Sequence, residues 1–481
     1  MLKRMVSGIM LTLLVLGMSM LAFNIQPVSA GTITVPDDYP TIQEAINAAN
    51  PGDTVYVKAG TYYENVIVNK PIALIGENRS TTIIDGGGIR HVISLMADNV
   101  NISGFNIRNS GSRYADDSGV HLVGHDHNNI SGNMFTDTYV SIYLEHSHNN
   151  MISDNVIVAT RQWYSIWLRY SHSNIVESNL VINNRGAGIA LWSSNTNIVE
   201  GNNVTGISTL ETADGRGITV YEGSHSNIIC NNILVDNRYC GVGLLNAEDN
   251  TIQGNVMKCN YLGIYSWKSN NIIIENTILN NDWYGICLYQ SYGSIIYHNN
   301  FISNTISSSG INTWDNGYPS GGNYWSDHVC TGNPSDGSQP YIIDTNNIDH
   351  YPFQDPNGWL LHQLTVTSSP ITGITFTING TTQTTPHTEW LPEGSYTLEM
   401  PETYNGYVWS HWLEDGDQNG TKTVTLPGTT WTGVFVSIPV GGYSVPIKGY
   451  IAEKPLTLCL ALIGILTASF TIAKRRKKQQ N

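Results

Sequence analysis

The sequence predicts an all-β protein in which a parallel β-helix solenoid precedes a small β-sandwich and a C-terminal transmembrane helix. The solenoid is predicted by a pair of residues, five positions apart, that recurs eight times at intervals of 21 to 30 residues. Such self-similarity is typical of repeat architectures. A short run with aliphatic residues at every second position precedes each pair, which indicates strands. The pairs are Asn128/Asn133, Asn150/Asn155, Asn174/Asn179, Asn197/Asn202, Asn227/Asn232, Asn250/Asn255, Asn271/Asn276 and Ser294/Asn299.

The recurring asparagines are expected to face inward. Turns of a β-helix stack about 4.8 Å apart, so equivalent residues of successive turns lie side by side. An asparagine amide can donate to one neighbouring turn and accept from the other. An inward amide without such a neighbour would cost about 1–3 kcal/mol. We therefore interpret the asparagines as scaffold that fixes the register, and we look for function in the outward columns.

The segment "PTIQEAINAAN" (40–50) predicts a short helix that covers the first turn of the solenoid. Thr41 and Glu44 form a capping-box pattern. The apolar residues Ile42, Ala45, Ile46 and Ala49 then lie on one helical face. Such a cover is needed because a solenoid exposes an unpaired strand edge at each end.

The two ends of the chain predict export and anchoring. Basic residues, an apolar run and a Val28-Ser29-Ala30 cleavage site indicate a signal peptide. An uncharged run before a basic cluster indicates a membrane span with a cytoplasmic tail, or a removable sorting signal. The expected divisions are 1–30 signal peptide, 31–355 β-helix, 360–437 β-sandwich, 438–455 linker, 456–473 transmembrane helix and 474–481 cytoplasmic basic tail.

The composition limits the classes of molecule that the protein is expected to bind. The formal net charge of −15 argues against nucleic acid and against anionic polymers held by charge alone. The six cysteines have no zinc-motif or disulfide-framework spacing. Glycosylation sequons occur at Asn78, Asn101, Asn129, Asn203, Asn379 and Asn419.

The repeats, with "TIQEAINAANPGDTVYVKAGTYYENVIVNKPIALIGE" before them and "WDNGYPSGGNYWSD" (314–327) after them, resemble the NosD-like right-handed parallel β-helix proteins. These belong to the group called carbohydrate-binding and sugar-hydrolysis domains. The resemblance covers roughly residues 33–353 and implies a right-handed solenoid and carbohydrate or copper as ligand. In related proteins a calcium-loop-like segment follows "GGNYW"; here 330–344 keeps part of that ligand set. The stretch from 368 to 400 resembles PEGA-type surface β-modules.

One outward face of the solenoid is predicted to be rich in aromatic residues. Such a row suits the apolar faces of sugar rings, with charged neighbours for the hydroxyls. Aromatic residues also favour strands and stack on one another between turns, and a loop would bury them, so both interpretations stay open. The candidate carbohydrate-binding residues are Tyr143, Trp167, Arg169, Trp192, Tyr221, Tyr265, Trp267 and Tyr289, joined by Trp314. The expected partner is an extracellular or cell-wall glycan.

Catalysis on a polysaccharide, by hydrolysis or elimination, is the first alternative. Hydrolysis needs two carboxylates on either side of the scissile bond. The candidates are Asp116, Asp117 and Glu145, although Glu145 is expected to pair with Arg169 one turn away. Neither polygalacturonase-type nor pectate-lyase-type clusters accompany them.

A copper-handling protein or a purely structural surface protein is the second alternative. Asp126, His148 and His172 precede successive asparagines by two residues and therefore lie on one corner. Imidazoles and a carboxylate about 5 Å apart suit copper or zinc. Polar residues at turns have the same appearance without a metal, so a metal site remains a hypothesis.

Overall fold

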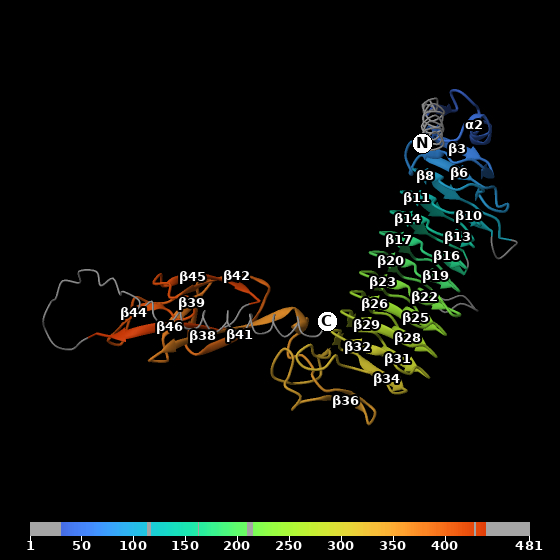
Figure 1. The fold of residues 1–481 in the computed structure, drawn as a ribbon. Coiled ribbons are helices and arrows are strands. Elements are labelled where there is room, and N and C mark those ends of the chain that lie inside the picture. Colours follow the sequence, from blue (N-terminus) through green and yellow to red (C-terminus); the bar gives the residue numbers. More distant parts are fainter. Residues whose placement is uncertain (1–29, 113–116, 162, 209–214, 428–429, 439–481) are drawn as a thin grey trace, which may run out of the picture. The chain divides into compact units, whose positions relative to one another are not determined.

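The computed structural model describes residues 30–112, 117–161, 163–208, 215–427 and 430–438 (Figure 1). The chain forms two compact units. The first holds the solenoid and extends to Leu364, together with Glu389–Gly394 and Thr425–Gly428. The second holds Thr365–Thr388, Ser395–Val424 and the described residues 430–438.

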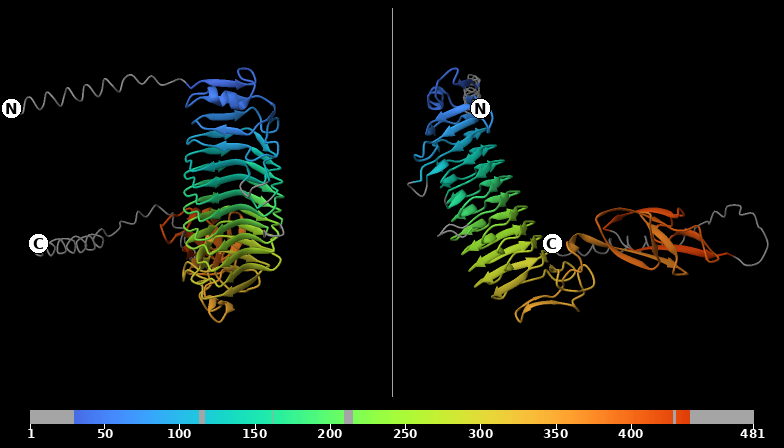
Figure 2. Two further views of the ribbon diagram at one scale, coloured as in Figure 1. Left: turned by 90° about the vertical axis from the view of Figure 1, so that its right-hand side faces the viewer. Right: turned by 180° about the vertical axis from the view of Figure 1, so that it is seen from behind.

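The first unit is an all-β parallel β-helix of the right-handed type, built from three sheets whose strands stack along its axis (Figure 2). Sheet A comprises β1 (Thr32–Val35), β2 (Thr54–Val57), β5 (Ala73–Gly76), β8 (Asn101–Ser103), β11 (Asn129–Ser131), β14 (Met151–Ser153), β17 (Ile175–Glu177), β20 (Ile198–Glu200), β23 (Ile228–Cys230), β26 (Asn250–Gln253), β29 (Asn271–Ile274) and β32 (Ile295–Tyr297). Sheet B comprises β3 (Gly60–Tyr63), β6 (Thr82–Asp85), β9 (Asn106–Arg108), β12 (Met134–Thr136), β15 (Val156–Val158), β18 (Leu180–Ile182), β21 (Asn203–Thr205), β24 (Ile233–Val235), β27 (Val256–Lys258), β30 (Thr277–Leu279), β33 (Asn300–Ile302) and β35 (Tyr324–Trp325).

Sheet C carries the longest strands of the solenoid and the predicted aromatic face. It comprises β4 (Val66–Val68), β7 (Ile93–Leu95), β10 (Ser118–Val123), β13 (Val140–Glu145), β16 (Tyr164–Arg169), β19 (Ala187–Trp192), β22 (Arg216–Tyr221), β25 (Cys240–Leu245), β28 (Leu262–Trp267), β31 (Tyr284–Tyr289) and β34 (Thr305–Ser309). Equivalent residues of adjacent turns pair in parallel, as Ile142 does with Ile166 and Leu144 with Leu168. These aliphatic side chains are fully buried, as the alternation predicts.

The asparagines face inward and form ladders, as predicted. Asn155 is typical. Its Oδ1 accepts the backbone N–H of Asn133 at 3.0 Å. Its Nδ2 donates to the carbonyl of Ile130 at 2.8 Å and to Oδ1 of Asn179 at 3.0 Å. Two further ladders were missed by the sequence analysis: an asparagine ladder five residues on, at Asn184, Asn237, Asn260, Asn281 and Asn304, and a serine ladder at Ser147, Ser171, Ser194, Ser224, Ser269 and Ser291.

The small residue near the start of each sheet C strand has a steric cause. A Cβ at Gly241 would lie 2.8 Å from the carbonyl oxygen of Gly263, and one at Gly263 would lie 2.3 Å from that of Gly285. At these two glycines the turns approach too closely for a side chain, whereas Ser141 and Ser165 occupy the equivalent positions of β13 and β16. The glycines of the repeated motif therefore permit the stacking that brings successive sheet C strands into register.

The predicted N-terminal cover is confirmed as helix α2 (Ile42–Ala48). The side chain of Thr41 accepts the N–H of Glu44, and Ile42, Ala45 and Ile46 are buried against the solenoid core. The carboxylate of Glu64 accepts the N–H groups of Ile42 and Gln43, each at 2.9 Å. An anion at a helix N-terminus satisfies donors that have no partner within the helix.

The C-terminal end of the solenoid is covered by the hairpin of β36 (Tyr341–Asp344) and β37 (Asn347–Asp349). Asn347 Oδ1 accepts the indole N–H of Trp314 at 3.0 Å. Trp314 is 1% exposed, so its expected place on the outer aromatic face was wrong. The indole belongs to the cover because it provides a donor for the last ladder residue.

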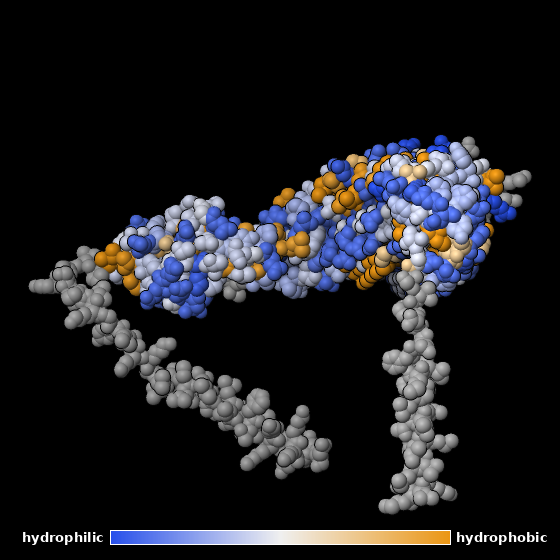
Figure 3. All heavy atoms as spheres, turned by 90° about the horizontal axis from the view of Figure 1, so that it is seen from above, coloured by the Kyte–Doolittle hydropathy of each residue, from blue (hydrophilic) through white to orange (hydrophobic). Residues whose placement is uncertain are grey.

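Some outward positions of the solenoid are also apolar. The first outward column of sheet A reads Ile175, Ile198, Ile228, Ile272 and Ile295, with Thr251 between the third and fourth. Figure 3 shows hydrophobic residues in bands between hydrophilic surface on the solenoid. The sheet A column is aliphatic, whereas the outer face of sheet C is aromatic, and only aromatic rings offer flat stacking surfaces.

The chain after the solenoid consists of a 3-10 turn (Gly358–Leu360) and two sheets. One has the order β41-β38-β46-β44-β43 and the other β40-β39-β42-β45. Their strands are β38 (Leu361–Ser369), β39 (Thr375–Ile378), β40 (Thr381–Thr384), β41 (His387–Pro392), β42 (Gly394–Glu399), β43 (Thr403–Tyr404), β44 (Tyr407–Trp412), β45 (Thr421–Leu426) and β46 (Thr430–Ser437). The pairing of β38 with β46 is parallel, whereas β39 pairs antiparallel with β40 and with β42.

Within the described ranges, no helix has the length and hydrophobicity needed to cross a membrane. The predicted signal peptide, linker, transmembrane helix and basic tail lie almost entirely outside the described residues.

Candidate functional site

The N-terminal part of the sheet C face is a stacked aromatic column. The ring of Tyr143 lies 4.4 Å from that of Trp167, with 14° between their planes. His121 stacks on the other side of Tyr143 at 5.1 Å, and His91 stacks on His121 at 4.0 Å. Tyr143 is 1% exposed, so its predicted exposure was wrong. Stacking between turns, the alternative interpretation, accounts for this part of the face.

The predicted ion pair between Glu145 and Arg169 is confirmed, with Glu145 Oε1 2.9 Å from Arg169 Nη1. The guanidinium also lies 5.9 Å from the ring of Trp167 and 5.0 Å from that of Tyr170. Burial raises the pKa of Tyr143 to about 12. The phenol therefore stays protonated at physiological pH, and the cation beside it is already neutralised.

The candidate catalytic carboxylates do not come together. Asp117 is buried just before β10, whereas Glu145 ends β13. Six strand positions, roughly 20 Å, separate them. Glycosidase carboxylates lie about 5–9.5 Å apart. Asp116 lies outside the described residues.

In the middle of the outer face of sheet C, side chains of the sheet itself cover the surface. The column that holds Trp167 continues with small buried residues, Ala190 and Thr219. Arg216 lies across this stretch and donates to the hydroxyl of Tyr221 at 2.7 Å. Its guanidinium is 5.6 Å from the ring of Tyr221 and 5.2 Å from that of Tyr239. Trp192 packs 5.5 Å from Tyr221 and is half-buried.

The exposed aromatic surface lies farther along, on the turns of β28 and β31. Trp283 and Tyr289 are each 50% exposed, and Tyr261 is 38% exposed. The predicted residues Tyr265 and Trp267 lie between them and are half-buried. Tyr261 and Trp283 lie 5.2 Å apart on adjacent turns. We call these five residues the aromatic platform.

Two residues of the platform were missed by the sequence analysis. Tyr261 and Trp283 come directly before β28 and β31, at the turn into sheet C. Tyr239 before β25 and Trp163 before β16 occupy the same position. In the sequence, each of these aromatic residues stands directly before an alternating run. That position was assigned to the connection between strands and not to an outward column of the strand.

A shallow depression borders the platform. It has a volume of about 220 Å³ and is lined by Glu248, Lys268, Ser269, Asn270, Gln290 and Tyr292. The Lys268 ammonium lies 4.9 Å from the ring centre of Trp267. Aromatic stacking surface and polar groups of both charges are therefore adjacent here.

The predicted metal corner is a backbone-binding ladder. Asp126 Oδ1 accepts the N–H of His148 at 2.6 Å. His148 Nδ1 accepts the N–H of His172 at 3.0 Å, and His172 Nδ1 accepts that of Asn195 at 3.0 Å. Asn195 Oδ1 continues the series to His225 at 2.9 Å. Each side chain acts as an acceptor for the next turn.

These residues do not fit a copper site. The rings of His148 and His172 are parallel within 4° and 5.0 Å apart. Ligand nitrogens lie about 2.0 Å from such a metal, so two nitrogens on one ion are at most roughly 4 Å apart. Each Nδ1 is already bonded to backbone. Among the described residues, no cluster of three or more His, Cys, Asp or Glu side chains is arranged to hold a metal. The calcium hypothesis for 330–344 also gains no ligand cluster, because Asp336 and Asp344 bond to nearby residues of their own turns.

The solved structures to which this chain is similar include a mannuronan epimerase module, an alginate lyase and a surface adhesin, each with a TM-score below 0.5. The A-module of mannuronan C-5 epimerase AlgE6 from Azotobacter vinelandii is 16% identical, with coverage of 56% of this chain and 90% of that chain and a TM-score of 0.46. An alginate lyase from Paenibacillus sp. is 16% identical (60% and 96% covered, TM-score 0.33). PfbA, a surface adhesin of Streptococcus pneumoniae, is 16% identical (66% and 97% covered, TM-score 0.43).

Comparison of sequences identifies the family. No curated protein matches the chain. The family model described as "Periplasmic copper-binding protein (NosD)" matches residues 46–213 and 208–330, which together are more than half of the chain. The chain therefore belongs to the NosD family.

Proposed function

We propose that this protein is an extracytoplasmic surface protein that binds carbohydrate on the outer face of sheet C. The observation that carries the proposal is the aromatic platform. Trp283, Tyr289 and Tyr261 expose more of their rings than Tyr143, which is buried, and than Trp167, Trp192 and Tyr221, which are half-buried. Contiguous exposed apolar surface on a folded protein usually marks an interaction site.

The chemistry of the platform suits sugars better than protein or lipid. Its rings stand on two adjacent turns of a rigid sheet, so flat surfaces recur about every 4.8 Å along the solenoid. The depression beside Trp267 offers the carboxylate of Glu248, the ammonium of Lys268 and the amide of Gln290. A ring with one apolar face and several hydroxyl groups uses both features. The formal charge of −15 disfavours polyanions bound by charge alone.

The covered part of the face has a supporting role in this proposal. Tyr143, Trp167, Arg169, Trp192 and Tyr221 hold one another through stacking and cation–ring contacts. Trp167, Arg169, Trp192 and Tyr221 remain partly exposed and border any glycan that extends beyond the platform. Export is supported by the signal-peptide pattern and by the periplasmic description of the NosD family.

The proposal is tested with a glycan array and a reducing-sugar release assay on the purified protein. We expect binding to at least one glycan class without release of reducing ends. The Trp267→Ala variant should lose most of that binding. Release of reducing ends from the bound glycan would favour a carbohydrate-active enzyme instead. No binding to any glycan would contradict the proposal.

A further inference from the structure

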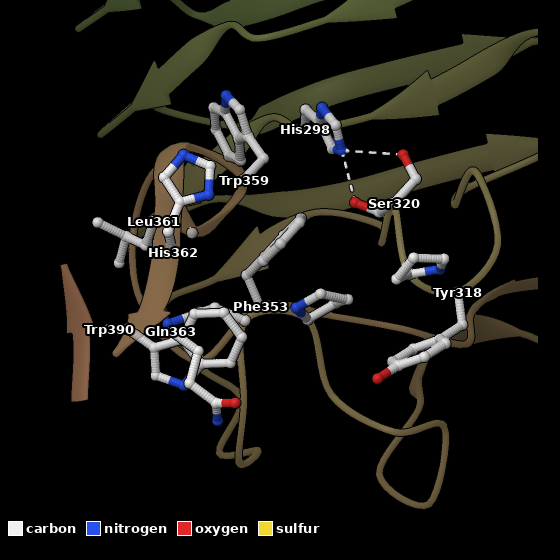
Figure 4. Close-up of a pocket in the computed structure, with 13 residues that line it drawn as sticks. His298, Tyr318, Ser320, Phe353, Trp359, Leu361, His362, Gln363 and Trp390 are labelled. Carbon is white, nitrogen blue, oxygen red and sulfur yellow. Dashed lines mark hydrogen bonds between the residues drawn. The ribbon is translucent and has the colours of Figure 1, made fainter. Parts of the chain in front are cut away.

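A second aromatic site lies at the C-terminal end of the solenoid. A pocket of about 420 Å³ opens there, and all its lining residues belong to the first compact unit (Figure 4). This volume falls within the range of roughly 300–1,000 Å³ typical of small-molecule sites. The lining residues are His298, Tyr318, Pro319, Ser320, Asn333, Pro334, Phe353, Gly358, Trp359, Leu361, His362, Gln363 and Trp390.

The walls of the pocket are rigid rings. Trp359 stacks on His298 with 5.4 Å between ring centres and 1° between planes. Phe353 meets both edge-on, at 5.7 Å from Trp359 and 5.6 Å from His298. Phe353 is buried, whereas Trp359 is half-buried and keeps part of its ring accessible. Three rings in fixed mutual contact form a preorganised apolar wall, which lowers the entropic cost of binding.

The polar groups of the pocket come from residues that include His298, Ser320, His362 and Gln363. His298 Nε2 donates to the carbonyl of Ser320 at 2.7 Å, which fixes the imidazole. Burial lowers the pKa of His298, so the ring is neutral at physiological pH. Tyr318 and Gln363 are exposed lining residues, and His362 is a half-buried one. Among the described lining residues none is Asp, Glu, Lys or Arg.

We infer that this pocket binds one ring of a neutral sugar, as a monosaccharide or as the end of a glycan chain. The ring stacks with its apolar face on Trp359. The Gln363 amide, the Tyr318 hydroxyl and the His362 imidazole supply the donors and acceptors that sugar hydroxyls need. A buried acidic sugar would bring a negative charge into a lining that has no Lys or Arg to pair with it, and such burial is costly.

A quaternary ammonium ion is also attracted to aromatic rings. It cannot use the amide, hydroxyl and imidazole groups that line this pocket, and no carboxylate of the lining neutralises it. The sugar therefore accounts for more of the observed groups. The pocket shares no residue with the aromatic platform, so the two sites can be tested separately.

The test is calorimetric titration of the purified full chain with four neutral probes: glucose, galactose, mannose and N-acetylglucosamine. Glucuronate and tetramethylammonium serve as charged comparisons. We expect at least one neutral sugar to bind and glucuronate to bind at least tenfold more weakly. The Trp359→Ala and Gln363→Ala variants should each weaken binding at least tenfold, whereas Tyr63→Ala, at an exposed position on β3, should leave it unchanged.

Gln363 is exposed, so its variant remains informative if Trp359→Ala unfolds. Three results would overturn the inference: no neutral sugar binds, the Gln363→Ala variant binds as the parent does, or tetramethylammonium alone binds. Loss of sugar binding in Trp283→Ala but not in Gln363→Ala would place the sugar on the platform and leave the proposed function standing without this pocket.

Discussion

Asp349 Oδ2 accepts the indole N–H of Trp325 at 2.8 Å, and this contact closes an asparagine ladder. Asn299 N–H donates to Asn323 Oδ1 at 3.0 Å, and Asn323 N–H donates to the same Asp349 oxygen at 2.7 Å. An open ladder would leave its last donors without acceptors. The "GGNYW" motif after the repeats is thereby explained as part of the terminal cover.

Trp325→Phe is expected to lower the free energy of unfolding by about 1–3 kcal/mol, because it leaves a buried acceptor with one donor fewer. The substitution keeps an aromatic ring between Phe301 and Tyr341, whose centres lie 4.5 and 4.0 Å away. Urea denaturation measures the change. Equal stability of the variant and the parent would show that the indole N–H is not needed to close the ladder.

The same carboxyl predicts a pH dependence of stability. Burial raises the pKa of Asp349 to about 7, from an ordinary value of 3.8. Since the folded pKa lies above the unfolded one, the contribution of Asp349 is complete below about pH 4 and is lost as the pH rises to about 7. The parent should therefore lose stability relative to Asp349→Asn between these values. A constant difference over this interval would contradict the burial argument.

His172 predicts a dependence of opposite sign. Burial and the neighbouring His148, His225 and His146 lower the pKa of His172 from 6.5. Because the folded pKa is the lower one, the contribution is present above about pH 6.5 and is lost as the pH falls through the folded value. His172→Asn keeps an acceptor, as Asn195 does in the next turn, and should abolish this loss in urea titrations from pH 8 to pH 5. His172→Ala should be less stable at every pH.

Copper binding gives a separate test of the corner that Asp126, His148 and His172 form. We expect the double variant His148→Asn with His172→Asn to bind as much copper as the parent in equilibrium dialysis, because both Nδ1 atoms are engaged with backbone N–H groups. Asparagine at both positions keeps a side-chain acceptor for the backbone N–H of the next turn, so the turns stay intact. A stoichiometric loss of bound copper in the variant would restore the metal-site hypothesis.

The interior asparagine ladders predict that replacing one of their residues strongly lowers the free energy of unfolding. Asn232 accepts from the N–H and Nδ2 of Asn202 and donates to Val199 O at 2.8 Å and Asn255 Oδ1 at 2.9 Å. Asn232→Leu should destabilise the protein by roughly 3 kcal/mol or more, since several buried groups lose partners. Asn203→Leu, on the outer side of sheet B, is the matched control and should change stability little. Similar effects of the two substitutions would contradict the ladder interpretation.

The sequence predicted which residues of successive turns stack in one column of sheet C. It did not predict how exposed their side chains are. Period 2 fixed the side of the strand on which Tyr143 and Trp267 lie. It carried no information about how closely His121 and Trp167 stack on the two faces of Tyr143. The metal hypothesis erred because His148 and His172 were read for ligand type, while their column also contains Asn195. What these side chains share is an acceptor for the next turn.

The central claim is that carbohydrate binds the aromatic platform, and one affinity comparison tests it most directly. The double variant Trp267→Ala with Trp283→Ala is titrated beside Tyr63→Ala, using the best glycan from the array. Tyr63 is 76% exposed but lies on β3 of sheet B. We predict at least a thirtyfold loss of affinity in the double variant, as expected for truncated aromatic anchors of about 2 kcal/mol or more, and none in Tyr63→Ala. Unchanged affinity in the double variant would contradict the account.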